Sequence, residues 1–205
     1  MTLSKIISDL FTFSFTTNTF ADKKHENVVK SIFLSNGLTQ IVKGDANFST
    51  LTNRKNNLTV VEELKNTFLF IDQPFGSQQS PDFIICVDGF ILWIECKSGK
   101  KIVWNTGYPK TDILVVFSSK KTDRTILFFG QFSKLIENNP NFEVLYEKFC
   151  EKWKKILKDE FDSLFNANGE SSDFDFYMRR MLNDKTKYEV KRDDFFERTK
   201  KLLAI

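Results

Sequence analysis

The stretch SPDFIICVDGFILWIECKSGKK, residues Ser80–Lys101, decides the fold of this chain. It contains two apolar runs, Phe83–Val87 and Phe90–Glu95, which are separated only by Asp88-Gly89. Asp-Gly between two strand-like runs is a strong signal for a hairpin, because a two-residue type I′ turn requires positive φ at both central positions. The sequence therefore predicts an antiparallel β-hairpin built from these two runs.

A two-residue turn also determines which residues of the hairpin face each other. Val87 pairs with Phe90, and each step away from the turn adds a pair, until Asp82 stands opposite Glu95. Directly opposed residues share a face of the sheet and have Cβ atoms about 4.5–5.5 Å apart. Lys97 lies two residues beyond Glu95 and so points to the same face. The hairpin thus gathers two carboxylates and one ammonium group at its open end.

The two opposed carboxylates repel each other, so a purely structural hairpin has little reason to keep Asp82 and Glu95 there. A divalent cation removes this repulsion, and Mg²⁺ is typically held by one or two carboxylates together with water and substrate phosphate. The cation activates a bound water, while a neighbouring lysine stabilises the transition state of phosphodiester hydrolysis. In the structural alternative, Asp82 simply ends a strand, and Glu95 and Lys97 form a surface ion pair.

Helix and strand patterns surround the hairpin. Apolar spacing predicts a helix over His25–Gly37, and a capping-box pattern of Thr59 with Glu62 predicts another over Thr59–Phe70. Continuous apolar runs predict strands at Asp112–Ser118 and Thr125–Phe129. From residue 141 onward helical spacing dominates, with helices predicted near 141–165, 174–182 and 193–203. This order indicates a single α/β domain over residues 1–205 with a mixed central sheet.

Composition excludes several classes of function. The net charge of the 205 residues is only +3, which does not by itself indicate a nucleic-acid binder. His25 is the single histidine, so zinc sites built on paired histidines and HNH nucleases are excluded. Gly-rich phosphate-binding loops are also missing from the sequence. Three cysteines without a CxxC pair, and no apolar run long enough to span a membrane, predict a cytoplasmic protein with reduced thiols.

Pro81-Asp82, followed after the hairpin by Glu95-Cys96-Lys97, resembles the PD-(D/E)xK motif of restriction-endonuclease-like nucleases. The resemblance implies a three-layer sandwich in which helices flank the central mixed sheet. It also implies a catalytic core at about 59–131 and a helical part at about 141–205. By motif position, the resemblance implies that Asp82 and Glu95 bind one or two Mg²⁺ ions, that the backbone carbonyl of Cys96 joins them, and that Lys97 is the catalytic lysine.

The resemblance implies further site residues around the motif. Many members of the superfamily add a glutamate from the preceding helix, and Glu63 is favoured over Glu62 because Glu62 already belongs to the capping box. Polar residues before the motif, basic residues after it and the loop beyond are candidates for DNA contact, since such side chains read base edges or hold phosphates. These candidates are Ser77, Gln78, Gln79, Lys100, Lys101, Asn105 and Lys110.

Together these features favour a type II restriction endonuclease, which cleaves double-stranded DNA at specific sequences in a Mg²⁺-dependent reaction and leaves 5′-phosphates. A palindromic site favours a homodimer, and the helix near 141–165 is a candidate for core or for dimer surface. The first alternative is another PD-(D/E)xK nuclease, such as a repair nicking enzyme or a junction resolvase. The second is a non-catalytic DNA-binding protein of the same fold.

Overall fold

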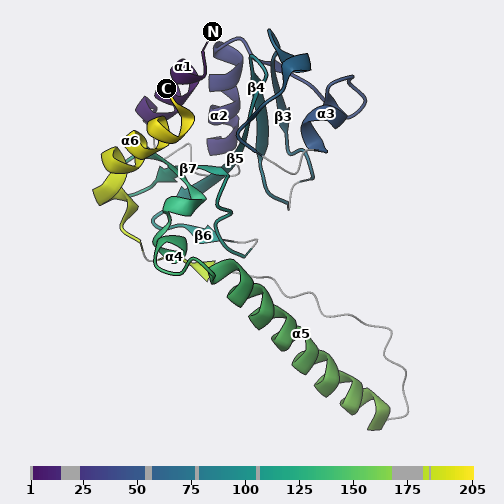
Figure 1. Cartoon of the computed structure of the whole chain (residues 1–205). Helices are drawn as coiled ribbons and strands as arrows, with labels where there is room; N and C mark the ends of the chain where they lie inside the picture. Colours follow the sequence, from purple (N-terminus) through teal and green to yellow (C-terminus); the bar gives the residue numbers. More distant parts are fainter. Residues whose placement is uncertain are drawn as a thin grey trace.

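A mixed β-sheet organises the chain. The computed structural model describes residues 2–14, 24–53, 57–76, 79–104, 107–167, 182–184 and 186–205. Seven strands form one sheet in the order β1-β3-β4-β5-β7-β8, with β2 also pairing with β5. The strands are β1 Thr39–Gln40, β2 Thr59–Val60, β3 Phe68–Asp72, β4 Phe83–Val87, β5 Phe90–Gly99, β7 Leu114–Ser119 and β8 Arg124–Phe129. This sheet packs against helices, which confirms the predicted α/β class (Figure 1).

The predicted hairpin is confirmed in strands and register. β4 and β5 pair antiparallel from Val87↔Phe90 beside the turn to Phe83↔Ile94 at the other end. Pairing stops there, so the predicted Asp82–Glu95 pair is not part of the sheet. Beyond Ile94, β5 pairs instead with β7 in parallel, on its other edge. The open end of the hairpin is therefore the place where β4 ends and β5 continues alone on that side.

The turn of the hairpin depends on its glycine. Asp88 and Gly89 have φ values of 52° and 80°, the left-handed values that a type I′ turn requires. A Cβ at Gly89 would lie 2.6 Å from the carbonyl oxygen of Val61. The N–H of Val61 donates to Gly89 O at 2.8 Å. The turn is thus fixed both by its own conformation and by the chain that crosses it.

Three helices share one core on one face of the sheet: α1 (Leu3–Thr12), α2 (Lys24–Ser35) and α6 (Arg192–Leu203). α1 and α6 lie side by side, near the N and C labels of Figure 1. The Phe11 and Phe196 rings stack with centroids 3.7 Å apart. The Arg192 guanidinium donates to Phe11 O at 2.6 Å and to Thr125 O at 2.8 Å. Elements from both ends of the sequence therefore complete one apolar core.

Short elements cover the opposite face. α3 (Phe48–Thr52) and the 3-10 helix η2 (Glu62–Leu64) pack their apolar residues on β3, β4 and β5. A two-stranded sheet of β6 (Val103–Trp104) and β9 (Leu182–Asn183) lies with η4 (Tyr188–Lys191) over β7 and β8. The small helices η3 (Gly130–Phe132) and α4 (Lys134–Glu137) follow β8. The sheet is thereby buried on both faces, as the continuous apolar strands predicted.

Two predicted helices differ from the structure. The helix predicted over Thr59–Phe70 is wrong, because these residues form β2, η2 and the start of β3. Leu58, just before this segment, and Asn66, within it, have positive φ, at which the chain turns instead of continuing a helix. The helix predicted over 174–182 falls almost wholly outside the described residues, and its last residue, Leu182, belongs to β9. The helices predicted at His25–Gly37 and 193–203 are confirmed as α2 and α6.

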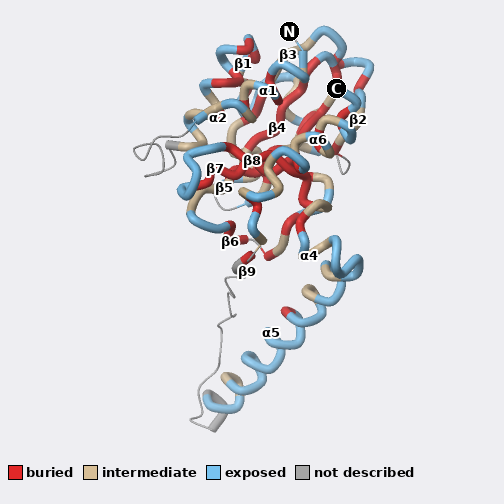
Figure 2. Tube along the Cα trace, turned by 90° about the vertical axis from the view of Figure 1, so that its left-hand side faces the viewer, coloured by how far each residue is buried: buried red, intermediate tan, exposed pale blue. Residues whose placement is uncertain are grey.

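The longest element, α5 (Phe142–Ala167), stands away from the sheet (Figure 1). Its surface is almost entirely exposed along the length whose burial is described (Figure 2). None of the described helices is long and apolar enough to cross a membrane.

Candidate active site

The Asp82 carboxylate marks the point where the two hairpin strands separate. Its Oδ2 accepts a hydrogen bond from the backbone N–H of Cys96 at 2.7 Å. Its own backbone carbonyl accepts from the N–H of Gln73 at 2.7 Å, which continues the bonding between the ends of β3 and β4. The Asp82 side chain therefore accepts the hydrogen bond that a further residue of β4 would otherwise accept from Cys96. Its carboxylate lies against the edge of β5 that β4 no longer covers.

Glu95 and Lys97 form an ion pair on β5 beside Asp82. The Lys97 ammonium donates to Glu95 Oε1, and the two side chains are only 8% and 13% exposed for Glu95 and Lys97 respectively. Glu95 Oε2 is buried and has no hydrogen-bond partner among the described residues. The ammonium also lies 5.9 Å from the centre of the Trp104 ring. An exposed surface ion pair, the structural alternative, does not describe this buried arrangement.

The two carboxylates influence each other strongly. Burial, and secondly repulsion from Glu95, raises the pKa of Asp82 to about 7. The hydrogen bond from the Cys96 N–H and the charge of Lys97 oppose this shift but do not cancel it. Burial likewise raises the pKa of the Cys96 thiol well above its usual range, so that side chain stays neutral. The predicted conflict between two acids thus exists, although Asp82 and Glu95 are not paired in the sheet.

The N-terminus of α2 brings His25 and Glu26 to the same place. Glu26 is close enough to raise the pKa of Asp82 and of the Cys96 thiol. Burial, followed by the charges of Lys97 and Lys120, lowers the pKa of His25 to about 4, which keeps its imidazole neutral. Glu26 was not among the residues predicted for the site, because its only signal in the sequence is an acid in the first turn of a predicted helix.

An ion pair holds α2 in this position. Lys30, one helical turn beyond Glu26, donates from Nζ to Asp72 Oδ2 at 3.0 Å. Asp72 ends β3 and pairs with Phe83, the residue that follows Asp82. Both groups are partly buried, so the bond fixes the start of the helix beside the end of the hairpin.

Glu63 and Glu62, the predicted additional acids, lie at the other end of the hairpin. They belong to η2, whose preceding residue, Val61, bonds to the Asp88-Gly89 turn. β4 has five residues between that turn and Asp82, which is a span of about 17 Å at about 3.3 Å per residue. The structure therefore does not bring Glu63 or Glu62 to Asp82 and Glu95.

The predicted DNA contacts are only partly brought together. Ser77, Gln78 and Asn105 lie outside the described residues. Gln79 is exposed just before the motif, and Lys100 and Lys101 are exposed just beyond β5. Lys110 is exposed near the end of the segment that connects β5 to β7, where its carbonyl lies against Gly130. It is therefore separated from Lys100 and Lys101 by the length of β7.

The β7–β8 turn adds Lys120, which was not among the predicted DNA contacts. The backbone N–H of Lys120 donates to Gly99 O at 2.8 Å, which places this residue beside the end of β5. The charge of Lys120 contributes to the lowered pKa of His25. Lys97, Lys100, Lys101 and Lys120 therefore lie at the end of β5 or in the turn beside it, and we call these four residues the basic rim.

The buried carboxylate of Asp184 anchors the segment that connects β5 to β7. Asp184 Oδ2 accepts hydrogen bonds from Trp104 Nε1 and Ser133 Oγ, each at 3.3 Å, and from the Tyr188 hydroxyl. Its Oδ1 accepts from the Thr186 N–H at 2.9 Å. Burial, together with the charge of Asp184, raises the pKa of Tyr188, so the phenol remains a donor. This network fixes the position of the Trp104 ring, which packs beside the Lys97 ammonium.

The ligand set for a cation is small. Among the described residues, no group of three or more histidine, cysteine, aspartate or glutamate side chains lies close enough to hold a metal ion. Asp82 and Glu95 remain, with one buried Glu95 oxygen lacking a partner in that part of the chain. Two carboxylates suit Mg²⁺, which keeps several waters and shares its ligands with substrate phosphate, better than a metal that needs a full set of protein ligands.

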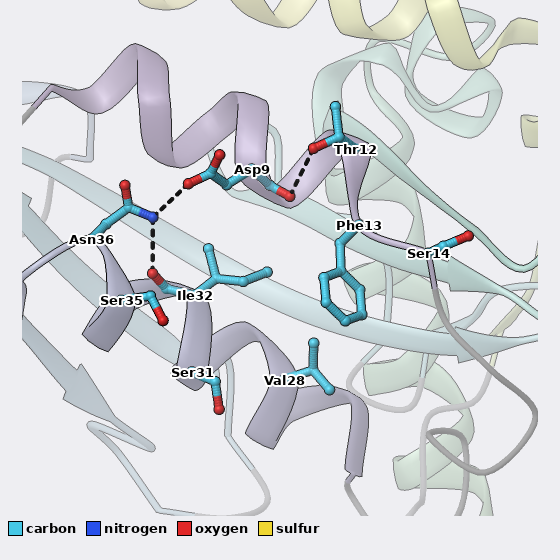
Figure 3. Close-up of a pocket in the computed structure, with 9 residues that line it drawn as sticks. All are labelled: Asp9, Thr12, Phe13, Ser14, Val28, Ser31, Ile32, Ser35 and Asn36. Carbon is cyan, nitrogen blue, oxygen red and sulfur yellow. Dashed lines mark hydrogen bonds between the residues drawn. The ribbon is translucent and has the colours of Figure 1, made fainter.

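A separate hollow of about 540 Å³ lies between α1 and α2 (Figure 3). At its edge, Asn36 Nδ2 donates to Asp9 Oδ2 at 2.7 Å and to Ile32 O at 3.0 Å. Neither Asp82, Glu95 nor Lys97 lines it. The Asn36–Asp9 bond joins the two helices to each other, and the hollow is not part of the candidate active site.

Comparison of the chain with protein-family models, with curated proteins and with solved structures finds no match.

Proposed function

We propose that this chain is a Mg²⁺-dependent endodeoxyribonuclease with a PD-(D/E)xK site, and specifically a type II restriction endonuclease. The observation that carries the proposal is the meeting of Asp82, Glu95 and Lys97 where β4 ends and β5 continues. The sheet with helices on one face and short elements on the other is compatible with the three-layer sandwich of that superfamily.

The acids at this point fit a cation. Glu95 Oε2 is a buried oxygen without a partner among the described residues, and Asp82 is destabilised as an anion by burial and by Glu95. Both features favour a positive charge between the two carboxylates. The carboxylates, together with the backbone carbonyl of Cys96, would hold Mg²⁺, which when bound polarises a phosphoryl oxygen and acidifies a water molecule.

Lys97 supplies the positive charge that belongs to the chain itself. The ammonium is fixed by Glu95 and packs beside Trp104, so it is held in place before substrate arrives. A fixed cation stabilises the negative charge that develops on phosphate oxygens during hydrolysis, because no solvent needs to reorganise around it. Lys97 is therefore the proposed catalytic lysine, and it also orients the attacking water.

The basic rim is the proposed approach for the DNA backbone. Lys100 and Lys101 extend from the end of β5, and Lys120 joins them from the neighbouring turn. Lysines of this kind bind phosphates without reading sequence. The base-reading surface is proposed to include Gln79 and the predicted contacts outside the described residues, and a homodimer is proposed for a palindromic site.

The test is digestion of plasmid DNA in the presence of Mg²⁺, followed by sequencing of the fragment ends. Cleavage at discrete sites leaving 5′-phosphates, lost in EDTA and in the Glu95→Gln variant, supports a restriction endonuclease. Cleavage limited to mismatched or branched DNA would instead favour a repair nicking enzyme or a junction resolvase. DNA binding without cleavage under any metal condition would leave the non-catalytic alternative.

A further inference from the structure

α5 carries a stripe of apolar side chains that the described part of the chain leaves exposed. At 100° per residue these positions fall on one side of the helix, and a single acid, the exposed Glu160, lies among them. The exposed fractions include 60% for Leu145, 54% for Phe149 and 43% for Trp153. The stripe continues with Ile156, Leu157 and Leu164, which are 40%, 37% and 64% exposed. Solvent contact over so much apolar surface is unfavourable, and a continuous exposed apolar patch of this kind is typical of an interaction surface.

The stripe is held away from the sheet by the contacts at the start of the helix. The Tyr108 hydroxyl donates to Glu143 Oε1 at 2.6 Å, and its ring packs edge-on against Phe142 and Tyr146. Beyond this anchor α5 extends into solvent (Figures 1 and 2). At 1.5 Å per residue its 26 residues span about 39 Å, which is long enough for a continuous helix–helix contact.

The charges beside the stripe are arranged in halves of opposite sign. Along one edge, Glu143 and Glu147 are followed by Lys154 and Lys158. Along the other edge, Lys148 and Lys152 are followed by Asp159. Two copies paired antiparallel bring each edge against the same edge reversed, so acids of one copy meet lysines of the other. A parallel pair brings the two unlike edges together, which also matches acids with lysines.

The same charges argue against other occupants. α5 has five lysines and six acidic residues, so it offers no excess positive charge to DNA or to an anionic membrane surface. A partner of one charge sign would meet repulsion along half of each edge. A second copy of α5 meets attraction along both edges, and the antiparallel direction also keeps the two Glu160 side chains apart. We propose that α5 is the self-association surface of this protein and that it pairs with α5 of a second copy. This inference does not depend on the proposed nuclease activity.

Sedimentation-velocity ultracentrifugation of the full chain over about 1–100 µM tests the proposal. The wild type is expected to shift from monomer to dimer, and Leu145→Glu and Ile156→Glu are each expected to weaken dimerisation by about tenfold or more, because a buried charge replaces an apolar contact. Val144→Glu is the matched control. Val144 is 54% exposed and neighbours Leu145, but it lies on the opposite side of the helix, so dimerisation should be unchanged.

A charge exchange provides an independent readout. Lys148→Glu should weaken the dimer a few-fold. Adding Asp159→Lys should restore it in an antiparallel pair, where residue 148 of one copy faces residue 159 of the other, whereas in a parallel pair the second change should weaken the dimer further. A wild type that stays monomeric at 100 µM overturns the proposal. Equal loss of the dimer in Val144→Glu and Leu145→Glu also overturns it, as does a dimer unaffected by all of these changes. Circular dichroism of each variant checks that the helix content is retained.

Discussion

The Asp82 carboxylate accepts a hydrogen bond from the backbone N–H of Cys96 across the open end of the hairpin, at 2.7 Å. Strand pairing ends at Phe83↔Ile94, so this side chain bonds a β5 N–H beyond the reach of the paired strand. The bond holds Asp82 near Glu95, and Lys97 is the positive charge that acts on both carboxylates. The separation of the two strands, more than their pairing, thus creates the candidate metal site.

Replacement of the charged groups should abolish cleavage without preventing folding. Glu95→Gln and Lys97→Gln are each expected to lower the rate of Mg²⁺-dependent DNA cleavage by about 10³-fold or more, because each removes a fixed charge from the reacting phosphate or its cation. Glutamine preserves a hydrogen-bonding partner in the buried pair, whereas alanine would leave the other charge buried alone. Single-turnover cleavage assays measure the rate, and gel-shift binding should be largely retained. Cleavage near the wild-type rate in Glu95→Gln would overturn the site assignment.

The two candidate additional glutamates can be separated by experiment. Glu26→Gln should slow cleavage by about 10-fold or more, since Glu26 acts electrostatically on Asp82 within the site. Glu63→Gln should leave the rate within about twofold of the wild type, because Glu63 lies in η2 beside the hairpin turn. The opposite ranking of these two variants, measured on the same DNA substrate, would restore the assignment predicted from the sequence.

The pH dependence of the free energy of unfolding should report how unfavourable it is to ionise the buried Asp82 carboxyl. Its folded pKa of about 7 lies above the ordinary value of 3.8 for an aspartate, so the native state binds the proton more tightly than the unfolded state does. Stability in EDTA should therefore fall as the pH rises from about 4 to 7. Asp82→Asn keeps an acceptor for the Cys96 N–H but cannot ionise. Urea unfolding should show the variant gaining about 1–3 kcal/mol on the wild type between pH 5 and pH 8. Parallel pH profiles for the two proteins would refute this explanation.

Addition of Mg²⁺ should stabilise the folded protein through the same acids. A ligand that binds only the native state stabilises it by about 2.7 kcal/mol at 100 times its dissociation constant. Thermal unfolding should therefore shift upward with millimolar Mg²⁺ in the wild type, and much less in Glu95→Gln. Equal shifts in both proteins would mean that the ion binds elsewhere.

The Asp184 network should be critical for the fold on the far side of Lys97. Asp184→Ala leaves the Tyr188 hydroxyl, the Trp104 indole and the Ser133 hydroxyl without their shared acceptor. Unsatisfied buried donors cost about 1–3 kcal/mol each, so urea unfolding should show a loss of about 3 kcal/mol or more. Tyr188→Phe removes one donor and its bond together and should cost only about 1 kcal/mol. A similar cost for both variants would show that the acceptor is not shared.

Local sequence signals predicted the hairpin, because Asp88-Gly89 determines both its turn and its register. They failed at Thr59–Phe70, where a capping-box pattern and apolar spacing suggested a helix. Tertiary contacts override this local preference. Val60 pairs with Phe90, and the N–H of Val61 donates to Gly89 O, so the backbone bonds of this segment go to the sheet and not to a helix. A periodic pattern of this length does not reveal that a neighbouring turn offers backbone partners.

The candidate site was predicted where its residues are close in sequence, and missed where they are distant. Asp82, Glu95 and Lys97 share one hairpin, so a turn type converts their spacing into geometry. Glu26 and Lys120 reach the same place through the packing of α2 and through the pairing of β7 with β5. Neither arrangement follows from local spacing, so the additional glutamate was sought in the preceding segment, where Glu63 was favoured over Glu62, and Glu26 was not considered.

The contacts between Arg192 and the end of α1 impose an order of events on biosynthesis. The hydrogen bond from Arg192 to Phe11 O joins residues 181 positions apart. Closing a loop of that length is entropically expensive, and contacts of such separation form late. While a ribosome is still translating the chain, α1 and β8 lack the helix that packs on them until α6 has emerged. The emerging protein must therefore carry exposed apolar surface until α6 has been synthesised, and this part of its core can close only after that.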